Sequence, residues 1–89
     1  MIKKKVTIIN KLGLHARAAV KFVNLANRFT SSVSIEKNGN EIDGKSILGI
    51  LTLAAVQGSE ITITISGHDE QAALDALSAL IQDRFNEAE

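Results

Sequence analysis

The stretch "EITITIS", residues Glu60 to Ser66, decides the fold. Isoleucine stands at Ile61, Ile63 and Ile65, and threonine fills the places between them. Because successive side chains of a strand point to opposite faces, this alternation predicts a strand with one apolar and one polar face. A sheet built from such strands packs one face against a core and leaves the other in water.

Two further segments carry β-branched residues in alternation and are predicted to be strands: "KKVTII", Lys4 to Ile9, and "SVSIEK", Ser32 to Lys37. Asn38-Gly39 follows the second segment and favours a tight hairpin, because a type I′ turn needs positive φ at both central residues. The return strand is expected to run through Ile42 and to end at Asp43-Gly44.

Helical periodicity replaces alternation in three other segments. The first is expected from Ala16 to about Phe29. Ser46 is suited to cap a short helix over "ILGILTL", residues 47–53, and Asp69 to cap a last helix. The first helix is expected to turn five residues toward the core: Ala19, Phe22, Val23, Ala26 and Phe29. The core face of the last helix is expected to be Leu74, Leu77, Leu80, Ile81 and Phe85.

The predicted element order is therefore βαββαβα. If the sheet has only one apolar face, all three helices must cover that face. This arrangement is a two-layer α+β open-faced sandwich. The length of 89 residues and the absence of any linker-like stretch predict a single domain over residues 1–89.

The composition excludes several classes of protein. Ten basic and ten acidic residues balance, and there is no Trp or Tyr, which argues against a nucleic-acid partner. No cysteine is present to form disulfides or a thiolate zinc site. The longest apolar run, "ILGILTLAAV", is about half of what a membrane helix needs, and the N-terminus lacks a signal-peptide pattern. We therefore expect a cytoplasmic protein with no membrane insertion.

His15 lies in "NKLGLHARAAVKF", where the first strand gives way to the first helix. The first helical turn leaves the backbone N–H groups of Ala16, Arg17 and Ala18 unpaired, at the positive end of the helix dipole. Such a position favours anions over an imidazolium, so the ring is expected to be a neutral nucleophile near pH 7. Arg17 adds a guanidinium suited to phosphate oxygens, and Gly13 permits a tight backbone path. These residue types together predict a phosphohistidine site.

Other interpretations of His15 stay open at this point. His-x-Arg alone is a weak signal, and an ordinary exposed histidine near a helix start has the same pattern. A zinc site lacks further ligands, because only His68 remains, and His68 is expected to be a solvated turn residue. A hydrolase lacks a nucleophile elbow. We expect neither a carboxylate nor a general base at the site, and therefore no metal and no cofactor.

"GLHARAA", Gly13 to Ala19, followed by "GKSILGILTL", Gly44 to Leu53, resembles the HPr family of phosphocarriers of the phosphoenolpyruvate-dependent phosphotransferase system. The resemblance covers essentially the whole chain and implies an antiparallel sheet of strand order 1-4-2-3. It also implies that enzyme I phosphorylates Nδ1 of His15, that Arg17 neutralises the phosphoryl oxygens, and that an EIIA-type domain accepts the group. Such a protein is a phosphoryl-transfer intermediate rather than a self-standing enzyme.

Two residues depart from the family pattern. Ala18 stands where the family usually has proline, and Gly49 stands where some sugar-system members have lysine. Alanine forms helices well, so we expect the site to survive with a slightly more mobile first turn. The docking surface is expected to be less basic.

The short second helix carries more apolar residues than one buried stripe can use. About half of them are expected in the core, while Ile47, Leu48 and Leu51 form an exposed patch on which partners dock beside His15. Ser46, which begins this helix, is open to two interpretations. It is a helix cap alone, or it is also phosphorylated by a dedicated kinase and restored by a phosphatase, as in some branches of the family.

Functions of other classes remain as alternatives. One is a regulatory module that docks on partner proteins without histidine phosphorylation. Another is a small-ligand-sensing domain, which is disfavoured because no further polar cluster suggests a pocket. Within the phosphocarrier class, sugar uptake and the nitrogen-related regulatory branch are both open, and a monomer is expected.

Overall fold

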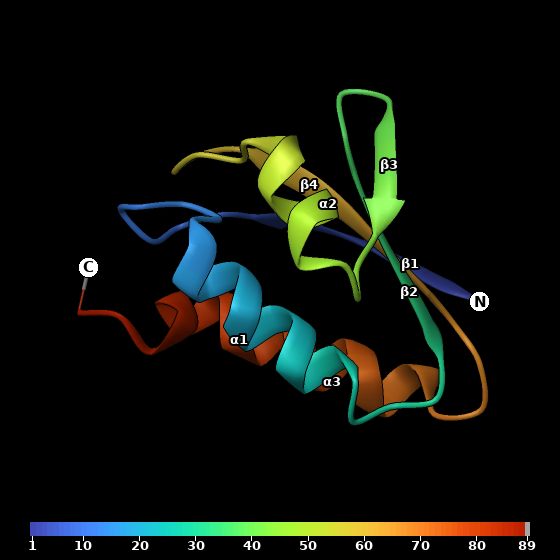
Figure 1. Ribbon diagram of the computed structural model, residues 1–89. Helices are drawn as coiled ribbons and strands as arrows, with labels where there is room; N and C mark the ends of the chain where they lie inside the picture. The colour runs from blue at the N-terminus through green and yellow to red at the C-terminus, as the bar shows by residue number, and fades with distance from the viewer. Residues whose placement is uncertain (89) are drawn as a thin grey trace.

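The computed structural model describes residues 1–88 and shows a four-stranded sheet with helices on one face (Figure 1). Along the chain the elements are β1 (Ile2–Thr7), α1 (Ala16–Ala26), β2 (Ser32–Lys37), β3 (Asn40–Asp43), α2 (Ile47–Leu53), β4 (Glu60–Ser66), α3 (Glu70–Gln82) and a single 3₁₀ turn, η1 (Arg84–Asn86). The strands lie in the order β1-β4-β2-β3, and every neighbouring pair is antiparallel. The predicted fold class and strand order are confirmed.

Strand β4 is central and has the predicted two faces. Ile61, Ile63 and Ile65 are buried, whereas Thr62 and Thr64 are only half-buried on the opposite face. Ile63 lies opposite Ile35 of β2, which places two buried side chains side by side on the core face. The hairpin between β2 and β3 also forms as predicted, with φ of +53° at Asn38 and +85° at Gly39.

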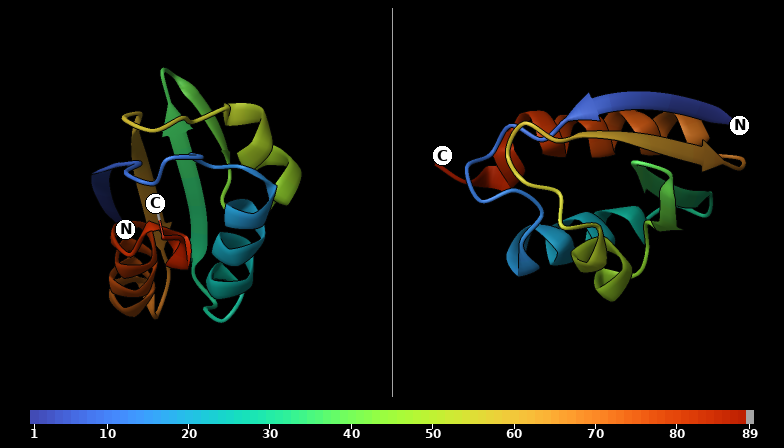
Figure 2. Two further views of the ribbon diagram at one scale, coloured as in Figure 1. Left: turned by 90° about the vertical axis from the view of Figure 1, so that its left-hand side faces the viewer. Right: turned by 90° about the horizontal axis from the view of Figure 1, so that it is seen from above.

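The helices pack against the isoleucine face of the sheet. Helix α1 contacts both α2 and α3, and Figure 2 shows that α1 and α3 run alongside each other. The core is the following set of buried apolar residues: Ile8, Leu14, Ala18, Ala19, Phe22, Val23, Ala26, Val33, Ile35, Ile50, Leu53, Ala55, Ile61, Ile63, Ile65, Ala73, Leu74, Leu77, Ile81 and Phe85. No helix among residues 1–88 is long and apolar enough to cross a bilayer.

Some predicted boundaries and roles are wrong. The first strand runs from Ile2 to Thr7 rather than from Lys4 to Ile9, because its pairing with β4 begins at Ile2 opposite Ile65 and ends at Thr7 opposite Glu60. Helix α1 ends at Ala26, so Phe29 is half-buried beyond the helix. Phe85 is fully buried as expected, but it lies in η1 with φ of +55° rather than on α3, which ends at Gln82.

Asp69 precedes α3 but does not cap it through its side chain. Its carboxylate instead accepts hydrogen bonds from the backbone N–H groups of Thr30 and Ser31, at 2.9 and 3.0 Å, and from the Ser31 hydroxyl at 2.5 Å. These bonds join the start of α3 to the loop between α1 and β2. The Ser31 hydroxyl bond is the largest of the effects that lower the pKa of Asp69, which falls to about 2.

Candidate functional site

A tight turn between β1 and α1 brings His15 to the start of the helix. Gly13 has φ of +67° and donates its N–H to the Asn10 carbonyl at 3.1 Å. A side chain at this position would place its Cβ only 2.4 Å from the Ala55 carbonyl oxygen, so glycine is required for the close approach. The next residue, Leu14, donates to the same Ala55 oxygen at 2.8 Å. His15 then adopts an extended conformation, and α1 begins at Ala16.

The His15 ring is paired with a carboxylate from the far end of the chain. Its Nε2 hydrogen-bonds to Oε2 of Glu87. The side chains are only 25% and 12% exposed, respectively. The expectation that the site contains no carboxylate is therefore wrong, because Glu87 of the C-terminal segment contacts the ring.

Asn10 holds the same carboxylate from the other side. Its Nδ2 donates to Oε1 of Glu87 at 2.9 Å and to the Gly13 carbonyl at 2.8 Å. Asn10 is fully buried, and its own Oδ1 has no partner among residues 1–88. The amide thus connects the turn that precedes His15 to the carboxylate that contacts His15.

The turn η1 directs Glu87 toward the site. Its three residues, Arg84, Phe85 and Asn86, have φ of +55°, +55° and +62° and take the chain off the helical path of α3. The buried Phe85 ring anchors the turn, and Nζ of Lys21 donates to the Phe85 carbonyl at 2.5 Å. Helix α1 therefore contacts both the C-terminal turn and, through His15, the residue that follows it.

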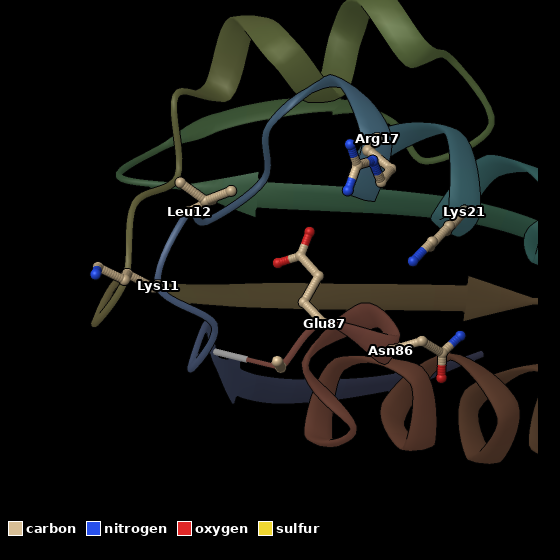
Figure 3. A pocket seen from close by; sticks show the side chains of 7 residues that line it. Lys11, Leu12, Arg17, Lys21, Asn86 and Glu87 are labelled. Carbon is tan, nitrogen blue, oxygen red and sulfur yellow. The ribbon is translucent and has the colours of Figure 1, made fainter.

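Cationic side chains surround the Glu87 carboxylate. A pocket of about 450 Å³ is lined by Lys11, Leu12, Arg17, Lys21, Asn86, Glu87 and Ala88. Figure 3 shows the Glu87 carboxylate projecting from the C-terminal segment into the space between Leu12 and Arg17. Arg17 is exposed and makes no ion pair with any residue between 1 and 88. Its guanidinium is available to an anion that approaches His15.

The environment keeps Glu87 ionised. Burial by itself raises the pKa of the Glu87 carboxyl, but the hydrogen bonds from His15 and Asn10 and the nearby positive charge of Lys21 outweigh it, so the pKa lies below its ordinary value. At neutral pH the group is a carboxylate and can only accept hydrogen bonds.

The predicted anion-binding residues differ in accessibility. Ala16 and Arg17 are exposed, and the first hydrogen bond of α1 is donated by Ala19 to the His15 carbonyl at 2.9 Å, which leaves the earlier N–H groups outside the helical pattern. Ala18, in contrast, is fully buried. The expectation that its N–H faces outward with those of Ala16 and Arg17 therefore does not match the structure.

The remaining predicted residues lie around this centre. Ser46 begins α2, and its Oγ accepts a bond from the Gly49 N–H at 3.0 Å, which confirms the cap. Ile47, Leu48 and Leu51 are exposed on α2, with Leu48 at 74%, while Ile50 and Leu53 of the same helix are buried. His68 is exposed in the turn before α3. Among residues 1–88, no three His, Cys, Asp or Glu side chains gather as metal ligands would.

Three residues of the site gave no recognisable signal in the sequence. Asn10 has the appearance of a loop residue after a strand, and Lys21 that of a solvated helix position. Glu87 belongs to no periodic segment, and its partner is 72 residues away in the chain. Only the predicted core position of Phe85, which is buried in the structure, indicated that the C-terminal end is fixed to the rest of the domain.

Comparisons with known proteins agree with the geometry. Residues 2–83 match the family model described as "PTS HPr component phosphorylation site". The chain is 53% identical to the phosphocarrier protein HPr of Cupriavidus necator over 89 residues, which is 100% of both chains. It is 47% identical over 83 residues to the HPr-like protein Crh of Bacillus subtilis, which covers 93% of this chain and 98% of Crh.

Solved structures give the same result. HPr-C-His from Thermoanaerobacter tengcongensis superposes with a TM-score of 0.96 at 39% identity, covering 100% of both chains. Membership of one family therefore accounts for the fold, for the histidine at the start of α1 and for the arginine two residues later. The chain belongs to the HPr family of phosphocarrier proteins.

Proposed function

We propose that His15 accepts a phosphoryl group from phospho-enzyme I and passes it to an EIIA-type acceptor domain. The observation that carries this proposal is the position of the imidazole, which lies at the start of α1 and contacts Glu87, a residue that lines the same pocket as the exposed Arg17. The protein then acts as a carrier in the phosphotransferase system, in sugar uptake or in its nitrogen-related regulatory branch.

The chemistry needs a nucleophile and a place for negative charge. Nε2 of His15 is occupied by Glu87, so Nδ1 is the nitrogen that attacks phosphorus. The N–H groups of Ala16 and Arg17, at the positive end of α1, and the Arg17 guanidinium receive the phosphoryl oxygens. Ala18 is buried, so we assign this role to the first two residues of the helix.

The partners are proposed to dock on the exposed apolar residues of α2. Ile47, Leu48 and Leu51 form this docking patch, and α2 packs directly against α1, which carries the site. Enzyme I and the acceptor must both approach the same imidazole, so each covers the patch in turn. This exchange requires a carrier that is free in the cytoplasm, and we propose that the carrier is a monomer.

Ser46 is proposed as a regulatory position for a serine kinase and phosphatase. Its hydroxyl caps α2 directly beside the docking patch. A phosphate there would be favoured by the helix N-terminus and would have to be desolvated whenever a partner covered the patch.

A second candidate function is a regulatory module that docks without being phosphorylated on histidine. The similarity to the HPr-like protein Crh favours this candidate. In a crystal structure, Crh, a catabolite repression protein of Bacillus subtilis, forms a dimer with a swapped domain.

The test is phosphorylation by enzyme I with phosphoenolpyruvate and Mg²⁺, followed by incubation with sugar-type and nitrogen-type acceptors separately. Acid-labile labelling is expected in the unmodified protein and in His68→Ala, and it should be absent in a folded His15→Ala variant. The acceptor that discharges the carrier identifies the branch. Labelling of His15→Ala would contradict the proposal, and a wild-type protein that is never labelled would favour the docking module.

A further inference from the structure

We propose that Glu87 is a positioning residue for His15, which keeps the imidazole proton on Nε2 and leaves the Nδ1 lone pair for the phosphoryl group. This inference rests on the proposed phosphorylation of His15. Glu87 lies outside the part of the chain that matches the HPr family, because that part ends at residue 83.

The proton assignment follows from the hydrogen bond itself. Oε2 of Glu87 is in contact with Nε2 of His15, and a carboxylate has no proton to give. Nε2 must therefore be the donor. A neutral ring with a proton on Nε2 has its lone pair on Nδ1, which is the nitrogen that can form a bond to phosphorus.

Asn10 fixes the carboxylate in this role. Its buried amide donates to the other oxygen of Glu87 at 2.9 Å and to the Gly13 carbonyl at 2.8 Å. Both oxygens of the carboxylate are thus held, one by the ring and one by the turn that precedes the ring. A positioning group needs such support, because a freely rotating carboxylate would not define the ring orientation.

The backbone is strained in order to deliver Glu87. Three consecutive non-glycine residues, Arg84 to Asn86, have positive φ, a conformation that side chains normally disfavour. The buried Phe85 ring and the bond from Lys21 to the Phe85 carbonyl stabilise the turn. Local strain that the surrounding packing maintains is characteristic of functional positions.

The transfer step balances without a general base. The Nδ1 lone pair attacks phosphorus, the new N–P bond forms, and the donor group of phospho-enzyme I leaves with the electron pair of its broken bond to phosphorus. No proton leaves His15, because Nδ1 carries none. The ring becomes a phosphoimidazolium, whose positive charge the Glu87 carboxylate neutralises through Nε2. The protonated ring remains a good leaving group for the onward transfer.

The other charged residues that line the pocket of Glu87 are cationic. Lys11, Arg17 and Lys21 line the same pocket, from the turn before α1 and from α1 itself. They attract the incoming phosphoryl group, whereas Glu87 is the only carboxylate among the residues that line this pocket. Glu87 therefore serves the ring rather than the phosphoryl oxygens.

The test compares Glu87→Gln with Glu41→Gln, which removes an exposed carboxylate on β3 away from the site. Nitrogen-15 NMR of the unphosphorylated proteins reports the tautomer. The wild type and Glu41→Gln should carry the proton on Nε2, and Glu87→Gln should show a mixture, because an amide can donate or accept. Charging by phospho-enzyme I should fall about tenfold in Glu87→Gln. Glu87→Asp should recover part of both properties.

Each result has a distinct meaning. A wild-type ring with the proton on Nδ1 overturns the inference without any variant, as does a Glu87→Gln protein that matches Glu41→Gln in tautomer and charging rate. Faster charging of Glu87→Gln also overturns it, because Glu87 would then be competing with the phosphoryl group. A wild type that shows the Nε2 tautomer but is never charged contradicts the proposed function and leaves the positioning role intact.

Discussion

Glu87 hydrogen-bonds to the ring of His15 across 72 residues of sequence, so the last turn of the chain is part of the candidate site. The contact depends on α3 ending at Gln82 and on the positive φ angles of η1, which break the helical path. Without that break, Glu87 would follow a helical path and would occupy a different position relative to α1. Stability and site geometry are therefore coupled at the C-terminal end.

This coupling predicts the effect of Phe85→Ala. The fully buried ring anchors η1, so its loss should cost about 3–5 kcal/mol of unfolding free energy. It should also release Glu87 from His15, because the strained turn loses its anchor. Urea denaturation measures the first effect and nitrogen-15 NMR of His15 the second. Phe29→Ala, at a half-buried position beyond α1, is the control and should leave the His15 spectrum unchanged.

Local periodicity predicted most of the fold. The alternation in β4, the Asn38-Gly39 turn and the cap at Ser46 each reflect physics confined to a few neighbouring residues, and all three are present. Patterns of this kind also give the two faces of the sheet, and hence the side on which the helices pack.

The turn η1 at the C-terminal end was not predicted, and the reason is physical. Phe85 follows Ile81 at the i, i+4 spacing of a helix, so the pattern continues although the helix does not. A left-handed turn has no sequence signal when two of its three residues are arginine and phenylalanine. The contact of Glu87 with His15 and Asn10 depends on that turn, so the carboxylate of the site was missed with it.

Arg17→Ala should slow transfer without unfolding the protein. The guanidinium is exposed and has no ion pair among residues 1–88, so the folded state loses little. A charge-assisted contact made in the transition state is worth ~1.5–3 kcal/mol, or roughly ten- to hundredfold in rate. Rapid-quench charging and thermal melting measure the two effects, with Arg28→Ala as the matched control. Equal rates for the two variants would show that the helix N–H groups suffice.

Leu48→Asp should weaken binding to enzyme I and to the acceptor alike. The side chain is 74% exposed in the docking patch, so the folded protein tolerates the charge, whereas a partner must desolvate it. We expect a loss of about 1–2 kcal/mol, roughly five- to thirtyfold in Kd. Titration calorimetry with each partner measures it. As a control, Ala72→Asp places the same charge on an exposed position of α3 and should bind both partners normally. Unfolding of the Leu48→Asp variant would contradict the prediction and assign Leu48 to the core.

Asp69 should make stability sensitive to acid. Its hydrogen bonds from Ser31 and Thr30 hold the pKa at about 2, below the ordinary value of 3.8. Between these values the unfolded chain binds more protons than the folded one, so this contribution is complete above about pH 4 and is lost as the pH falls toward 2. Asp69→Asn should lose stability at pH 7 and show a flatter decline in acid. The measurement is the free energy of unfolding between pH 2 and pH 7, with Asp75→Asn as control. If that free energy fell equally with pH in both variants, the prediction would be contradicted.

Two substitutions of Ser46 distinguish its role as a helix cap from its proposed role in regulating the charging of His15. The hydroxyl accepts the Gly49 N–H at 3.0 Å, so Ser46→Ala should cost about 1 kcal/mol of stability and leave charging of His15 nearly intact. Ser46→Asp keeps a cap acceptor and places a negative charge at the positive end of α2, so its stability should be retained or should rise. That charge lies beside the docking patch and must be desolvated when enzyme I binds, so charging should slow. Melting temperature and charging rate measured on both variants test the two roles together, and equal charging rates would leave Ser46 as a helix cap alone.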